Sequence, residues 1–139
     1  MRQRTMLLAS AAVAMGLGLL SVPVRAHHGT NISYDRSTTV TIKAVVAEFR
    51  YRSPHPALFV DVMNDQGKPT RWTIEIAPTP YTLALRGWSK RRSEEALAPG
   101  TSVSLDIYPS RAGTPVGLLQ DVVNDAGVEI FGDDGGTAR

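Results

Sequence analysis

The chain has 139 residues, of which 42% are hydrophobic, enough to form one domain around one core. It contains no cysteine, so disulfides and thiolate metal sites are excluded and the fold must be stabilised by packing alone. The formal charge is +2, but three of the fifteen basic residues stand within the first 25 positions, where no acidic residue occurs.

The first 26 residues are typical of a secretory signal peptide. Two arginines precede an apolar run over 6–20, and Val24 and Ala26 stand three and one positions before a cut at His27. A membrane anchor is the alternative, but the apolar run has about 15 residues and a span requires roughly 20. We therefore expect cleavage after Ala26, export to the periplasm or the medium, and no stable membrane span afterwards.

Cleavage would also change the charge of the protein. Arg2, Arg4 and Arg25 would leave with the signal peptide, so twelve basic residues would remain beside thirteen acids, a formal charge of about −1. The charge balance of the mature chain therefore does not favour nucleic acid as a partner.

An irregular lead is predicted over 27–36, followed by a long first strand. Apolar residues such as Val40 and Ile42 alternate with polar ones, which is the two-residue period of a half-buried strand. The pattern continues to Tyr51. It ends in Ser53-Pro54-His55-Pro56, because each proline removes a backbone donor.

A hairpin is predicted next. Residues 57–63 and 70–77 alternate in the same way and are joined by a turn cluster over 64–69. Gly67 in this turn can adopt a positive φ without strain. The two segments therefore indicate antiparallel neighbours.

One short helix is predicted after the hairpin. Thr79 is a suitable N-cap, Pro80 fits the first helical position, and apolar residues follow at helical spacing up to Gly87. A helix between the third and fourth strands restricts the choice of fold.

The remaining strands complete the predicted domain. Alternation returns over 102–108 and 117–123, a short partner strand is expected at 128–131, and a Gly- and Asp-rich flexible tail covers 132–139. Long strand, two strands, helix and two strands is the element order of an OB-fold, a small five-stranded barrel. We therefore predict an all-β fold with one short helix, an OB-fold-like barrel over 37–131. A small β-sandwich is the alternative.

Several short motifs resemble those of a known family. In chain order they are Ala26-His27-His28-Gly29, Tyr34-Asp35, Ser53-Pro54-His55, Trp72-Thr73-Ile74-Glu75, Leu85-Arg86-Gly87-Trp88 and Leu97-Ala98-Pro99-Gly100. With them the chain resembles a family of small exported bacterial proteins catalogued as a domain of unknown function, number 6152. The family typically has asparagine in place of Ser53 and aspartate in place of Thr101. The resemblance implies export and one β-rich domain, and it implies no activity.

The three histidines are the residues best suited to bind a metal ion. Cleavage after Ala26 would give His27 a free α-amine beside its imidazole, and these two nitrogens can chelate one ion. His55, held between two prolines, would supply a second imidazole, with His28 or Asp35 assisting. Three nitrogens suit Cu(II), so copper is the expected cofactor if one is bound. The alternative is that the histidines are solvated or cap backbone groups.

A basic segment around an aromatic ring indicates a different function. Arg86, Lys90, Arg91 and Arg92 surround Trp88, so this segment can dock another exported protein without a metal. Two glutamates follow directly, and an ordinary charged connection is the alternative.

The sequence contains no specific catalytic motif. No serine lies in a Gly-x-Ser-x-Gly elbow, and Asp61 and Glu75 occupy the polar phase of their strands, where solvent exposure is expected. We therefore predict a binding domain and not an enzyme. It is either a Cu(II)-holding module or a metal-free interaction module.

Overall fold

The computed structural model describes residues 33–132. The predicted signal peptide at 1–26, most of the predicted lead, and residues 133–139 of the predicted tail lie outside this range. The elements of the described part are, in chain order, β1 (Val40–Arg50), β2 (Ala57–Met63), β3 (Pro69–Glu75), α3 (Pro80–Leu85), α4 (Lys90–Ala96), β4 (Ser102–Pro109) and β5 (Val116–Asn124).

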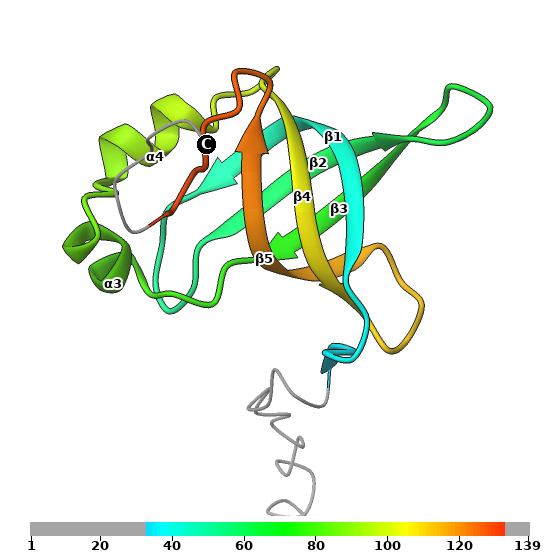
Figure 1. Cartoon of the computed structure of the whole chain (residues 1–139), viewed down its shortest axis with the longest axis horizontal. Helices are drawn as coiled ribbons and strands as arrows, with labels where there is room; N and C mark the ends of the chain where they lie inside the picture. The colour runs from blue at the N-terminus through cyan, green and yellow to red at the C-terminus, as the bar shows by residue number, and fades with distance from the viewer. Residues whose placement is uncertain (1–32, 133–139) are drawn as a thin grey trace, which may run out of the picture.

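The five strands form a closed barrel. Their order around it is β1-β2-β3-β5-β4, and neighbours are antiparallel except for β3 and β5, which run parallel (Figure 1). Strand β1 serves both halves, because its first half pairs with β4 and its second half pairs with β2. A bulge between Val46 and Glu48 bends it. The prediction of an OB-fold-like barrel is confirmed, and the β-sandwich is excluded.

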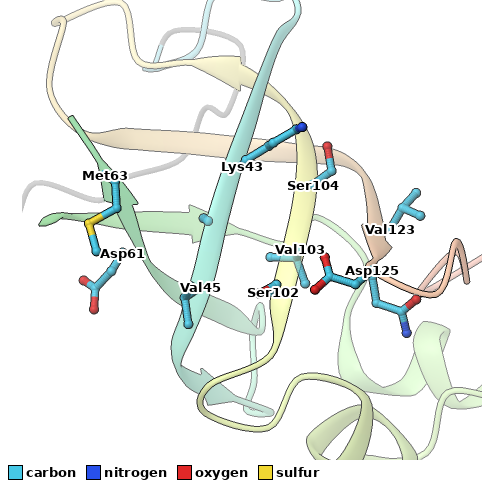
Figure 2. A pocket seen from close by; sticks show the side chains of 11 residues that line it. Lys43, Val45, Asp61, Met63, Ser102, Val103, Ser104, Val123 and Asp125 are labelled. Atoms are coloured by element: carbon cyan, nitrogen blue, oxygen red, sulfur yellow. The ribbon is translucent and has the colours of Figure 1, made fainter. Parts of the chain in front are cut away.

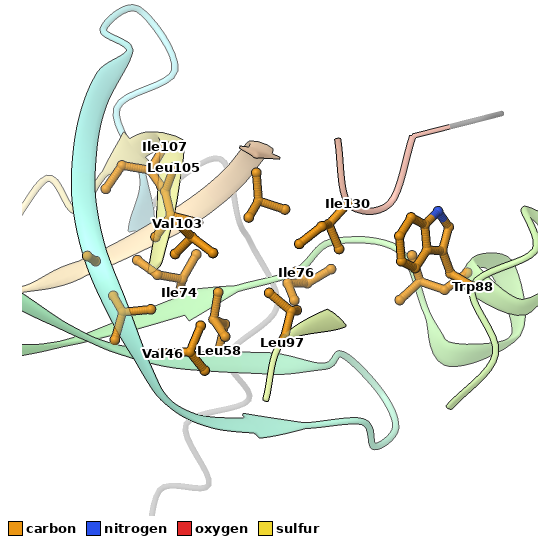
Figure 3. Close-up of a cluster of buried hydrophobic side chains, with 14 residues drawn as sticks. Val46, Leu58, Ile74, Ile76, Trp88, Leu97, Val103, Leu105, Ile107 and Ile130 are labelled. Atoms are coloured by element: carbon orange, nitrogen blue, oxygen red, sulfur yellow. The ribbon is translucent and has the colours of Figure 1, made fainter. Parts of the chain in front are cut away.

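Alternation along the strands decides which side chains fill the barrel. The fully buried residues include Leu58 and Val60 of β2, Ile74 of β3, and Leu105 and Ile107 of β4, and together they form one continuous core (Figure 3). Burial of each such side chain stabilises the fold by about 1.5–3 kcal/mol. The intervening residues lie on the outer face of the barrel and carry its polar groups.

Two short helices, and not the single one predicted, cover one end of the barrel. Helix α3 begins where predicted, because the Thr79 hydroxyl accepts the backbone N–H of Thr82 at 3.2 Å. Helix α4 begins after Ser89, whose hydroxyl accepts the backbone N–H of Arg92. Within residues 33–132 no helix is long and apolar enough to cross a bilayer.

We call α3 and α4 together the helical cap. Trp88, which lies between them in the chain, joins the helical cap to the core. Its side chain is 2% exposed, and its indole N–H donates to the carbonyl oxygen of Gly132 at 3.0 Å. Its ring packs edge-on against Phe131, with 5.3 Å between the ring centroids. Gly132, the first residue of the predicted tail, is therefore fixed against the helical cap.

Candidate functional site

His55 lies in the connection between β1 and β2, directly before the buried Pro56. The carbonyl oxygen of Pro56 accepts the backbone N–H of Ile76 at 3.1 Å, so the β2–β3 ladder continues beyond Ala57 towards His55. The Nδ1 atom of His55 is buried and has no hydrogen-bond partner within residues 33–132. A buried ring nitrogen is normally satisfied by another polar group, a water molecule or an ion, so the missing partner of this atom is the feature to explain.

The N-terminal lead is attached to the barrel near this ladder. Tyr34 is 5% exposed, and its hydroxyl donates to Oε2 of Glu75 at 2.8 Å. Glu75 pairs with Ala57 across β2 and β3, and Ala57 stands two residues after His55. The structure therefore connects the lead to the His55 region through Tyr34 and Glu75. Sequence reasoning missed this contact, because it assigned Glu75 to a solvated face.

Asp35, a predicted assisting ligand, is engaged in its own turn. Its Oδ1 atom accepts the hydroxyl and the backbone N–H of Ser37 at 2.7 and 3.1 Å, and Arg111 lies 3.7 Å away. The hydrogen bonds from Ser37 hold the pKa of the Asp35 carboxyl below its usual value. A carboxylate with these partners has less capacity left to bind a metal ion.

The described residues do not form a complete metal site by themselves. No group of three or more His, Asp and Glu side chains within 33–132 is placed to hold one ion. His27 and His28, which the prediction needs, lie outside the described residues. Of the four predicted metal ligands, the structure describes only His55 and Asp35. The Asp35 carboxylate is bound to Ser37 and lies near Arg111.

A hollow of about 490 Å³ is lined by residues of β1, β2, β4 and the end of β5 (Figure 2). Its lining includes Val45, Met63 and Asp61, and it includes none of the predicted site residues. Asp61 forms an ion pair with Arg71 at 2.6 Å, whereas Glu75 is bonded to Tyr34 at the other end of the same ladder. The two carboxylates therefore do not form a catalytic pair.

The family model of a family of unknown function (DUF6152) matches residues 16–120. The chain belongs to this family. The resemblance inferred from the short motifs is thereby confirmed. No curated protein matches the chain. Among solved structures, the chain is similar to the mitochondrial single-stranded DNA-binding protein of S. cerevisiae, with 12% sequence identity and a TM-score of 0.43. That similarity covers 63% of this chain and 94% of the other.

In this DUF6152 member most basic side chains of the predicted docking segment interact with neighbouring residues of the same segment. Lys90 and Arg91 lie 3.8 and 3.3 Å from Glu94 and Glu95, one helical turn further on. Arg92 stacks on the Trp88 ring, with its guanidinium carbon 4.2 Å from the centroid, and Arg86 is exposed. Because Trp88 is buried, only the basic side chains of the predicted set can contact a partner.

Tyr34→Phe is expected to lower the free energy of unfolding at neutral pH by about 1 kcal/mol, because it removes one hydrogen bond. Burial, followed by the bond to Glu75, raises the pKa of Tyr34. Its contribution is therefore fully present below the pKa of a free phenol, about 10, and is lost as the pH rises further.

The decline of the free energy of unfolding above pH about 10 should be shallower for Tyr34→Phe than for the unchanged protein. Denaturant unfolding at neutral and alkaline pH measures both effects. Identical slopes in the two proteins would show that Tyr34 is solvated when folded. Tyr81→Phe, at an exposed position, is the matched control.

Proposed function

We propose that the protein is an exported domain that holds Cu(II) through the N-terminal amine and imidazole of His27 together with His55. The observation that carries the proposal is the buried Nδ1 atom of His55, which has no partner in the described chain. Leaving such an atom unsatisfied costs about 1–3 kcal/mol. A bond to a metal ion removes that cost.

The bond from Tyr34 to Glu75 supports the proposal, because it anchors the chain shortly after His27 to the ladder that runs towards His55. Tyr34 stands seven positions after His27, a length of chain that spans about 23 Å when extended. The hydroxyl of Tyr34 lies 2.8 Å from Glu75, which is paired with Ala57, two residues after His55. Two imidazole side chains extend the reach further.

The donor set decides the metal. The α-amine and ring nitrogen of His27 close a chelate, and His55 adds a third nitrogen. Nitrogen-rich sites with tetragonal geometry suit Cu(II). An exported domain with this site would store copper, deliver it or reduce its toxicity.

The test is a Cu(II) titration of the protein recovered after export with its own leader, with the N-terminal residue verified by mass spectrometry. We expect one ion per chain with micromolar or tighter affinity. His55→Ala should weaken binding at least tenfold, since even changes next to metal ligands lower affinity by about 10–100-fold. One extra residue before His27 should have a similar effect, because it blocks the amine.

His28→Ala and Asp35→Asn are the matched controls, and each is expected to change the affinity less than His55→Ala does. Electron paramagnetic resonance of the bound Cu(II) should show three nitrogen donors, and two in His55→Ala. Affinity unchanged in His55→Ala, or a processed chain that begins elsewhere than His27, would contradict the proposal.

A further inference from the structure

An apolar pair stands exposed on α3. Tyr81 and Leu85 are 73% and 70% exposed, the highest values among the large hydrophobic residues of the described chain. They are four positions apart, so they lie on the same face of the helix. Leu83 is fully buried between α3 and the core. Two large apolar side chains on one exposed helix face make this face a candidate interaction site.

The fold holds this pair in a fixed position. A six-residue helix is too short to be stable alone, and α3 depends on its contacts with the barrel. The hydroxyl of Tyr51 lies 2.7 and 3.0 Å from the carbonyl oxygens of Pro80 and Trp88, at the two ends of the α3 segment. Figure 1 shows α3 at one end of the long axis of the molecule, opposite the β2–β3 hairpin. The apolar pair therefore belongs to a helix at one end of the protein, and both side chains are exposed there.

Positive charge follows the pair directly. Arg86, Lys90, Arg91 and Arg92 come within seven residues of Leu85, with no acidic residue among them. The pairs of Lys90 and Arg91 with Glu94 and Glu95 are exposed, and the Arg91 side chain is 85% exposed. Exposed ion pairs of this kind are weak, so they cost little to break.

We propose that the protein docks on a lipid surface that contains anionic headgroups, with Tyr81 and Leu85 entering the interface and Lys90 and Arg91 meeting lipid phosphates. Exposed apolar side chains followed closely in the chain by cations have the chemistry of interfacial membrane anchors. A planar lipid surface suits a helix at one end of the protein, since it adapts to the side chains that enter it. This proposal is independent of copper, which is proposed to bind near His55.

The test is sedimentation of the exported protein with vesicles of phosphatidylcholine containing about one third phosphatidylglycerol, compared with pure phosphatidylcholine. We expect binding to the anionic vesicles that falls as salt is added. The variant Tyr81→Ser/Leu85→Ser should lower the partition coefficient about tenfold or more, and Lys90→Gln/Arg91→Gln should lower it several-fold.

Two control variants separate docking from a general change in surface properties. Met63→Ser removes another exposed apolar side chain, 62% exposed, and Lys43→Gln/Lys68→Gln removes two cations outside the helical cap. Both should bind vesicles as the unchanged protein does. Failure to bind anionic vesicles, or equal losses in controls and α3 variants, overturns the proposal. So does a shift to dimers that depends on Tyr81 and Leu85, because a second copy would then cover the pair.

Discussion

Replacing Trp88 with alanine is expected to lower the free energy of unfolding by about 3–5 kcal/mol, the range for deleting a buried aromatic side chain. The indole is 2% exposed and packs against Phe131, and its N–H binds the carbonyl of Gly132. Its loss would leave a cavity between the helical cap and the barrel. Denaturant unfolding followed by far-ultraviolet circular dichroism measures the change.

Trp88→Phe is the matched variant, because it keeps an aromatic ring and removes the indole donor. We expect it to lose less than half as much stability as Trp88→Ala. Arg91→Ala, on the exposed side of the same segment, should change stability by less than about 0.5 kcal/mol. If Trp88→Ala lowers the free energy of unfolding by less than about 1 kcal/mol, the ring is not part of the core. It could then contact a docking partner.

The barrel was predictable because its strands carry strict alternation. The strand predicted over 57–63 agrees with β2, and the strands predicted over 70–77, 102–108 and 117–123 differ from β3, β4 and β5 by one or two residues at their ends. The short strand predicted at 128–131 is not formed, and an isolated bridge from Glu129 to Val123 stands in its place. Each of β2, β3, β4 and β5 buries one face in a common core, so the two-residue period is strong. The parallel contact between β3 and β5 has no local signal, and it was not predicted.

Helix α4 was not predicted, because its sequence lacks an apolar stripe. Its buried residue is Ser93, whose hydroxyl donates to the carbonyl of Ser89 at 2.9 Å. The available signals were the Ser89 cap and two pairs of opposite charge at a spacing of four residues. These signals are weak individually, and a search for apolar periodicity does not detect them.

The candidate site was predictable in part. The two prolines around His55 indicated a rigid connection, and the structure places that residue beside a continued β2–β3 ladder. The bond from Tyr34 to Glu75 joins residues 41 positions apart. No local pattern predicts such a contact, since it depends on how the lead folds back across the barrel. The alternation of β3 predicted that Glu75 is exposed to solvent. Alternation within one strand does not show whether a distant segment, here Tyr34, packs over that face.

Gly117→Ala is expected to lower the free energy of unfolding by about 1–3 kcal/mol through overpacking. Gly117 is buried in β5, opposite Pro109 of β4. A Cβ atom there would lie 2.7 Å from Cδ1 and 3.2 Å from Cβ of Ile107. The nearer separation is too short for two carbon atoms, so Ile107 or the strand must move. Denaturant unfolding of the variant measures the loss.

The double variant Gly117→Ala/Ile107→Val tests whether this contact is the cause. Valine lacks the Cδ1 atom, so the alanine methyl gains room, while Ile107→Val alone costs about 0.5–1.5 kcal/mol. We therefore expect the loss caused by Gly117→Ala to be smaller in the Ile107→Val background than in the unchanged protein. A contact of this kind gives a coupling of about 0.5 kcal/mol or more. Strictly additive losses would place the strain elsewhere in β5. The Cβ atom of position 107 remains in valine, so the rescue should be partial.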